Sequence, residues 1–125
     1  MKKIYILRDE RGETPIQHFL EALDVKARNK LERGFYCLAT QPDYLKPPNV
    51  KHFTIERYKQ LYEYRARIRI LLRVIFSMDE AGDIILLRPF IKRHERDTMQ
   101  ALEQALHDLE RTKRESLLEY TPRGV

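Results

Sequence analysis

The segment from Gln60 to Phe76 constrains the fold of this chain most, because its residues alternate in character with a period of two. Such alternation is typical of a half-buried strand. An unbroken strand of this length would be exceptional, so we expect a turn between Arg67 and Leu71 and a second strand over 73–76. One face of the segment would carry Leu61, Glu63, Arg65, Arg67 and Arg69, and the other Tyr62, Tyr64, Ala66, Ile68 and Ile70.

The amino-terminal half predicts one strand followed by two helices. Residues 3–7 are β-branched and aromatic, as in a strand. Thr14-Pro15 favours a helix start, and Gln17 completes a capping box. A second helix, capped by Asp24, should run to about residue 40, and three prolines make 41–49 a loop. The segment that follows this loop, 50–57, is ambiguous.

The carboxyl-terminal half adds one strand and one helix. A turn at 79–83 precedes a strand over 84–91, which Pro89 places at a sheet edge or a bulge. Asp97 or Thr98 should cap the last helix, and the tail from about residue 115 has no clear partner and is expected to fray. The order β-α-α-β-β-β-α predicts an α+β fold, with helices packed on one face of an antiparallel sheet, in a single domain of residues 1–125.

The positive charge of the chain is concentrated in the alternating segment. The formal net charge is +5, and the window 57–73 alone contains six basic residues and one acid. A second basic run, 88–96, contains four basic residues and Glu95. Charge gathered in this way predicts a patch that binds a polyanion.

Other features of the sequence exclude several classes of protein. The single cysteine, Cys37, fits a reducing compartment, and no apolar run is long enough for a signal peptide or a membrane span. The four histidines lie far apart, without the spacing of metal ligands. We therefore expect a cytoplasmic protein with no metal and no cofactor.

Arginines on one strand face suit the recognition of RNA, because the planar guanidinium binds phosphate oxygens through several donors. RNA cleavage by attack of a ribose 2′-hydroxyl needs cations that stabilise the phosphorane-like transition state. It also needs a base and an acid, for which Glu63 and His94 are candidates. The alternative interpretation is a solvated sheet face whose arginines pair with local acids.

The chain resembles the RelE/ParE superfamily of toxin–antitoxin toxins, and most closely its phage-derived, HigB-like branch. The resemblance spans roughly residues 3–110 in element order. The residues that carry it are Leu61-Tyr62-Glu63-Tyr64-Arg65, Leu72-Arg73-Val74-Ile75-Phe76, the run Ile84-Ile85-Leu86-Leu87 with Phe90, Lys92 and Arg93, and Pro15 with Phe19-Leu20.

This resemblance implies a RelE-like fold and a ribosome-dependent messenger-RNA endonuclease that needs no metal. It implies catalytic roles for Arg65, Arg73 and Arg93, with Lys92 beside them and Glu63 or His94 handling protons. We expect contacts with RNA or the ribosome from Lys51, His52, Arg57, Lys59, Arg67, Arg69, Arg88 and Arg96. The implied partners are the ribosome, messenger RNA, a helix-turn-helix (Xre-type) antitoxin and, through that antitoxin, operator DNA; no membrane is involved.

Two other functions stay open at this point. Enzymes of the RelE type often carry a tyrosine near the start of the last helix, and this chain has none there. One alternative is therefore a ParE-like inhibitor of DNA gyrase, in which the basic patch contacts protein or DNA without catalysis. The other is a relic that only binds its antitoxin and operator DNA.

Overall fold

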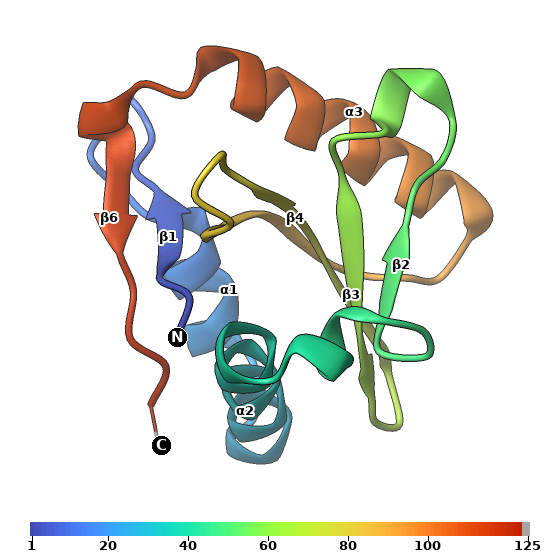
Figure 1. The fold of residues 1–125 in the computed structure, drawn as a ribbon. Coiled ribbons are helices and arrows are strands. Elements are labelled where there is room, and N and C mark those ends of the chain that lie inside the picture. The colour runs from blue at the N-terminus through green and yellow to red at the C-terminus, as the bar shows by residue number, and fades with distance from the viewer. Residues whose placement is uncertain (124–125) are drawn as a thin grey trace.

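The computed structural model describes residues 1–123, apart from the side chains of Arg67 and Arg114. A 6-stranded sheet in the order β2-β3-β4-β5-β1-β6 forms its centre (Figure 1). The strands are β1 (Ile4–Leu7), β2 (Val50–His52), β3 (Tyr62–Arg67), β4 (Leu71–Met78), β5 (Ile84–Ile91) and β6 (Leu117–Glu119). The helices are α1 (Pro15–Ala22), α2 (Val25–Thr40) and α3 (Glu95–Arg111), with short 3₁₀ helices η1 (Pro42–Leu45), η2 (Glu56–Tyr58) and η3 (Arg114–Ser116).

The first two helices begin where the sequence predicts. Pro15 is the first residue of α1. The Thr14 hydroxyl donates to the Gln17 Oε1 and caps no backbone amide, so the predicted capping box is wrong. At the start of α2 the Asp24 carboxylate accepts a hydrogen bond of 2.8 Å from the Ala27 amide, so the predicted cap is confirmed. The apolar face of α2 is buried, and it comprises Ala27, Leu31, Phe35 and Leu38.

Strands β3 and β4 form the hairpin that the alternation predicts. Arg65 lies opposite Arg73 and Arg67 lies opposite Leu71, so the turn falls at 68–70, inside the expected window. Tyr64 belongs to the core under α1 and α2, whereas Leu61 belongs to the core under α3. The predicted division of β3 into two faces is therefore confirmed as far as Ala66.

The sheet is mixed rather than antiparallel, which corrects the prediction. β1 pairs with β5 in parallel, whereas β3, β4 and β5 pair antiparallel in chain order. The local turn signals indicated only the antiparallel neighbours. The pairing of β1 with β5 joins segments far apart in the chain, so no turn signal announces it.

Helices lie on both faces of the sheet, not on one face as predicted. α1 and α2 share a core with Val74 and Phe76, and α3 shares a second core with Ile75 and Leu87 (Figure 1). Both faces of β4 and β5 are apolar where successive residues are buried, as at 74–76 and 84–87. A strand that is apolar on both faces needs cover on both.

Three further segments refine the expected layout. The tail, for which the sequence offered no partner, pairs antiparallel with β1 over residues 117–119. α3 begins at Glu95, earlier than the expected caps Asp97 and Thr98. The Asp97 carboxylate lies inside the first turn and accepts a hydrogen bond of 2.8 Å from the His94 amide. Pro89 was predicted to lie at a sheet edge or a bulge. It lies beyond the part of β5 that pairs with β1, and close to a register shift between β5 and β4.

Gly34 allows α2 to approach the sheet closely. A Cβ at this position would overlap the phenol of Tyr64, which is fully buried in β3. We expect Gly34→Ala to destabilise the protein by about 3 kcal/mol, the cost of forcing atoms into a packed core. Urea unfolding measures this change. The same substitution in a Tyr64→Leu background should cost clearly less, and equal costs in the two backgrounds would refute the overlap.

Candidate functional site

Glu63, Arg65 and Arg73 lie beside one another on the side of β3 and β4 that faces α3, and we call them the strand cluster. Arg65 and Arg73 are directly opposite in the β3–β4 register. Glu63 is two residues before Arg65, so alternation places both on the same face. The Arg65 Nε donates to the Glu63 Oε1 at 2.9 Å. The strands therefore hold two guanidinium groups around one carboxylate.

Burial gives the strand cluster its electrostatic character. The Glu63 side chain is only 3% exposed, whereas that of Arg65 is 38% exposed. Burial lowers the pKa of Arg73; the charge of Glu63 opposes this, and the charge of Arg65 adds to it. Among the side chains that the structure describes, none forms a hydrogen bond with the buried Glu63 Oε2 or Arg73 Nε. The cluster therefore keeps unused hydrogen-bonding capacity, and its two arginines are half-buried.

A small hollow of about 310 Å³ lies next to the strand cluster, between the end of β5 and the start of α3. Phe90, which is opposite Arg73 in the β4–β5 register, lines it together with Arg93 and His94. The Lys92 amide donates to the Leu71 carbonyl at 2.9 Å, which fastens this end of β5 to the start of β4. The hollow and the strand cluster therefore occupy the same end of the sheet.

Asp97 fixes the backbone around this hollow. Its carboxylate accepts hydrogen bonds of 2.8 Å from the amides of Arg93 and His94. These bonds lower the pKa of Asp97, so it stays ionised at neutral pH. The side chains of Arg93 and His94 are exposed. A cation and an imidazole are thus presented to solvent from an ordered loop, as phosphate binding and proton transfer require.

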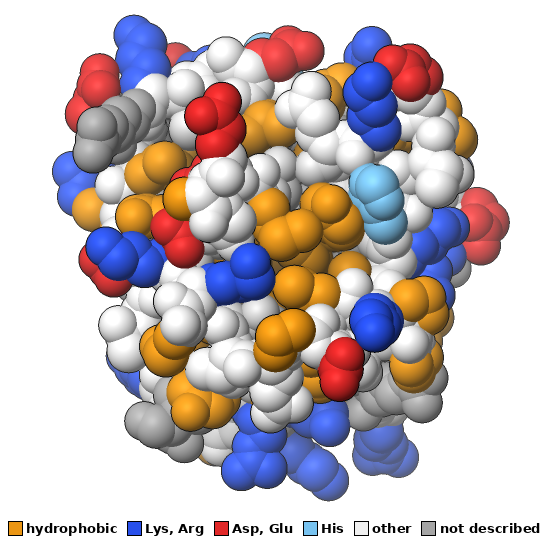
Figure 2. All heavy atoms as spheres, viewed as in Figure 1, with side chains coloured by type: hydrophobic (Ala, Val, Ile, Leu, Met, Phe, Trp, Pro, Cys, Tyr) orange, Lys and Arg blue, Asp and Glu red, His pale blue; other side chains and the backbone are white. Residues whose placement is uncertain are grey.

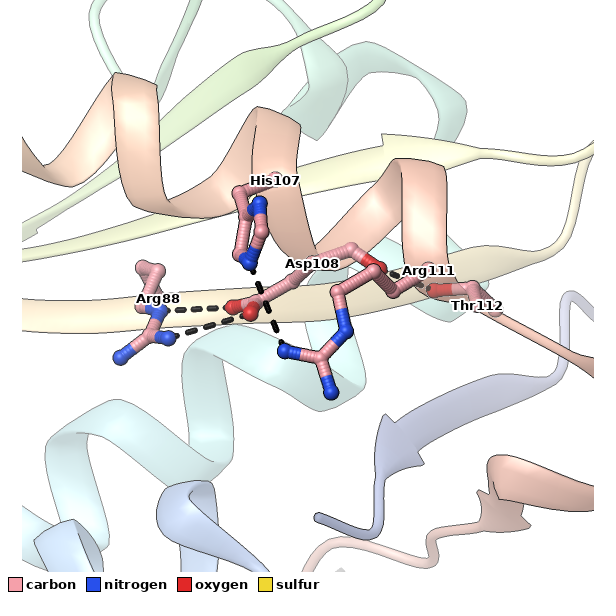
Figure 3. Close-up of polar contacts among 5 residues, drawn as sticks. All are labelled: Arg88, His107, Asp108, Arg111 and Thr112. Atoms are coloured by element: carbon pink, nitrogen blue, oxygen red, sulfur yellow. Dashed lines mark hydrogen bonds and ion pairs between the residues drawn. The ribbon is translucent and has the colours of Figure 1, made fainter. Parts of the chain in front are cut away.

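Arg88 belongs to a different part of the molecule, although it was predicted to contact RNA. Its guanidinium holds Asp108, in the second half of α3, through bonds of 2.6 and 3.1 Å (Figure 3). In the last turns of α3, the His107 Nε2 and the Arg111 Nη1 lie 3.4 Å apart. The hydroxyl of Thr112, just after the helix, donates to the Asp108 carbonyl at 2.7 Å. The two-point Arg88–Asp108 pair fastens β5 to α3.

Arg57 and Lys59, two further predicted RNA contacts, are engaged with acids in and around η2. Arg57 donates two hydrogen bonds of 2.8 and 2.7 Å to Glu103 of α3, which also accepts from the Tyr58 hydroxyl. The Lys59 ammonium lies 2.7 Å from the Glu56 carboxylate. A polyanion that approached either side chain would compete with these carboxylates.

Lys51 and His52 lie on the edge strand β2 and point to opposite sides of it. The Lys51 ammonium lies 5.2 Å from the centroid of the Phe53 ring, next to the core under α3. His52 stacks on Tyr62 with centroids 4.4 Å apart, and its Nε2 is 2.7 Å from the Lys59 carbonyl. Because Tyr62 belongs to the other core, only Lys51 shares the face of the strand cluster.

The remaining predicted residues are spread over two regions. Lys92 forms an ion pair of 3.3 Å with Glu95, and Arg96 is exposed in the first turn of α3, near the hollow. Arg69 lies in the β3–β4 turn and lines a groove beside α2, away from the strand cluster. The side chain of Arg67 lies outside the described part of the structure. The structure thus brings together Glu63, Arg65, Arg73, Lys92, Arg93, His94 and Arg96.

Sequence reasoning missed the basic face of α2 that borders this groove. Lys26, Lys30 and Arg33 line it together with Arg69. Their separations of four and three residues are those of side chains on one helix face. The basic residues within 25–40 recur at helical spacing, and this period would have revealed the face. The density of charge along the sequence is highest in the strands and so indicated only them.

The Glu103 contacts predict a specific pH dependence of stability. Hydrogen bonds from Arg57 and Tyr58 lower the pKa of Glu103 from 4.5 to about 2. A lowered folded-state pKa stabilises the protein above the unfolded value, and this stabilisation is lost as pH falls from 4.5 toward 2. The melting temperature of Glu103→Gln should therefore be lower than that of wild type at about pH 6. It should also fall less than that of wild type as the pH is lowered. Glu110→Gln, an exposed change on α3, is the control; parallel acid profiles for wild type and Glu103→Gln would contradict the prediction.

No known protein family matches this sequence, and no curated protein is similar to it. Among the described residues, no three His, Cys, Asp or Glu side chains converge as metal ligands would. The described helices also include none with the length and apolar character needed to cross a membrane.

Proposed function

We propose that this chain is the toxin of a type II toxin–antitoxin system and cleaves messenger RNA on the ribosome, as a HigB-like member of the RelE/ParE superfamily. The observation that carries the proposal is the strand cluster beside the Arg93–His94 hollow. Two arginines opposite one another across a strand pair, next to an exposed imidazole, suit an RNA phosphate. The element order also agrees with the expected β-α-α-β-β-β-α layout once the short strands β2 and β6 are set aside.

In the proposed reaction, Arg65 and Arg93 bind the scissile phosphate and stabilise the charge that grows on its oxygens. Arg73 is partly buried opposite Arg65. Its charge adds to the positive potential at the phosphate. His94 is exposed at the rim of the hollow and transfers one of the two protons, either from the attacking 2′-hydroxyl or to the departing 5′-oxygen, and solvent water exchanges the other. The products are a 2′,3′-cyclic phosphate and a free 5′-hydroxyl.

The burial of Glu63 changes the role proposed for it. A general base must reach the proton that it removes. The Glu63 side chain is 3% exposed and is already paired with Arg65. We therefore propose that Glu63 positions the arginines and that His94 is the stronger candidate for proton transfer.

In vitro translation followed by primer extension tests the proposed activity directly. The purified chain should produce new 5′ ends within messages that ribosomes are translating, and none in the same RNA without ribosomes. The chain should keep this activity after dialysis against a chelator. If no cuts appear in translated messages while the chain arrests growth on expression, the proposed endonuclease activity is wrong.

A gyrase inhibitor of the ParE type is the second candidate function. The observation that favours it is the burial and pairing of Glu63, which leaves the strand cluster without an exposed carboxylate base. A supercoiling assay with purified gyrase separates the two functions. Inhibition of supercoiling without RNA cleavage would establish this alternative, and a chain that neither cleaves RNA nor slows growth would be a relic.

The proposed toxin acts in the cytoplasm, where ribosomes and messages are found. Its proposed partner is a helix-turn-helix (Xre-type) antitoxin, which masks the toxin and binds operator DNA. Co-purification with the product of an adjacent gene tests this partner. A neighbouring protein that forms no complex with the chain would remove this part of the proposal.

A further inference from the structure

An open groove of about 970 Å³ lies between the first half of α2 and the tip of the β3–β4 hairpin. Five cationic side chains and one acid line it: Lys26, Lys30, Arg33, Arg69, Arg123 and Asp24. In Figure 2, Lys and Arg side chains gather at the lower end of the molecule, where Figure 1 shows the start of α2 and this hairpin tip. We call this feature the α2 groove.

The cations of the α2 groove differ from most of the basic residues discussed above. Arg57, Lys59, Arg65, Arg88 and Lys92 each pair with a carboxylate. Among the residues that the structure describes, the five groove cations form no ion pair. The Asp24 carboxylate is engaged in capping α2 through the Ala27 amide. The groove therefore keeps a net positive charge, with five cations and one carboxylate among the residues that line it.

Apolar side chains accompany these cations. Ala27, Ile68 and Ile70 line the α2 groove. Of these, Ile70 is a large apolar side chain that is 39% exposed. Large apolar side chains on a surface are informative where they cluster, because such clusters mark interaction sites. The groove is thus both cationic and apolar.

We propose that the α2 groove binds an acidic, amphipathic segment of a partner polypeptide. Carboxylates of such a segment would pair with the five cations, while its apolar residues would cover Ile68 and Ile70. A nucleic acid backbone would satisfy the cations but would leave the apolar side chains in contact with solvent or phosphate. This assignment is independent of the proposed RNA cleavage, because Lys30 and Arg33 do not belong to the strand cluster.

Fluorescence anisotropy with a labelled synthetic peptide tests the proposed binding. The probe is an amphipathic helical peptide of about 15 residues with a glutamate face and a leucine face, long enough to span several helical turns. A scrambled peptide of the same composition lacks the apolar face. A single-stranded RNA of similar net charge is the third probe. The full-length chain is used throughout, and circular dichroism checks that each variant is folded.

The amphipathic peptide should bind most tightly, and its affinity should fall as salt is raised. Lys30→Glu and Arg33→Glu should each weaken it by about fivefold, since each reversal replaces an attraction by a repulsion. Lys113→Glu, an equally exposed reversal after α3, should have no such effect. Ile70→Ser should also weaken binding of the amphipathic peptide but not of the scrambled one.

Three results would overturn the proposal. The first is the absence of peptide binding, and the second is an equal effect of the Lys30 and Lys113 reversals. The third is RNA binding that is tighter than peptide binding and is abolished by Lys30→Glu. Cleavage of ribosome-bound messages by Lys30→Glu provides the separate readout. Because it concerns the other site, it succeeds or fails independently of peptide binding.

Discussion

Replacing Arg65 by alanine should lower the rate of cleavage of ribosome-bound messages by about 100-fold or more, the usual cost of losing one donor to a developing oxyanion. Arg65 is accessible to solvent, with 38% of its side chain exposed. It can therefore contact phosphate while its Nε stays bonded to Glu63. Single-turnover cleavage, followed by primer extension on stalled ribosomes, measures the change.

Two control variants distinguish a role in cleavage from a role in folding. Arg65→Lys keeps the charge but loses the planar fork, so its activity should fall between that of wild type and that of Arg65→Ala. Arg11→Ala, an exposed change far along the chain from the strand cluster, should leave cleavage unchanged. Arg93→Ala changes an exposed side chain and should slow cleavage without loss of stability. Full activity in both Arg65→Ala and Arg93→Ala would exclude the proposed site.

Glu63→Gln should have the largest effect on stability among polar substitutions in this chain. The carboxylate compensates Arg65 and the partly buried Arg73, whose guanidinium groups lie on directly opposite residues. Glutamine has nearly the same shape but no charge, so two neighbouring cations would remain without a counter-charge. We expect a loss of about 3 kcal/mol in the free energy of unfolding, as for removal of one partner of a buried ion pair.

Chemical unfolding of a small set of variants isolates this effect. Glu80→Gln, in the exposed turn before β5, should change the free energy of unfolding by less than about 0.5 kcal/mol. Adding Arg73→Met to Glu63→Gln removes one of the two cations and should recover a large part of the loss. If the double variant is no more stable than Glu63→Gln alone, electrostatic compensation is not what Glu63 provides.

Local chemistry explains which elements were predictable from the sequence. Asp24 caps α2, and Gly82, with a φ of +85°, forms the turn before β5, because each signal acts within a few residues. The pairing of β1 with β5 and the strand at 117–119 depend on partners far away in the chain. No period or turn residue encodes such partners. Apolar runs such as 74–76 did contain a signal for two covered faces, which the prediction of a one-sided sheet overlooked.

The candidate site was predictable only where the strand geometry is regular. Alternation places Glu63 and Arg65 on one face, and the hairpin brings Arg73 opposite Arg65. Within the turn the period is lost, so Arg69 lines the α2 groove, although the sequence suggested the face of Arg65. Pairing with acids was also hidden, because Glu103 and Asp108 lie on α3, far in sequence from Arg57 and Arg88.

The two edges of the sheet have a consequence for assembly. The edge strands β2 and β6 have only 3 residues each, so they offer few free backbone groups for pairing with another chain. Short edges hinder the edge-to-edge growth through which sheet proteins aggregate. The same feature leaves little room for a partner to extend the sheet with a strand of its own. Association with other macromolecules must then rely on side chains, a mode in which charge and shape determine which partners are accepted.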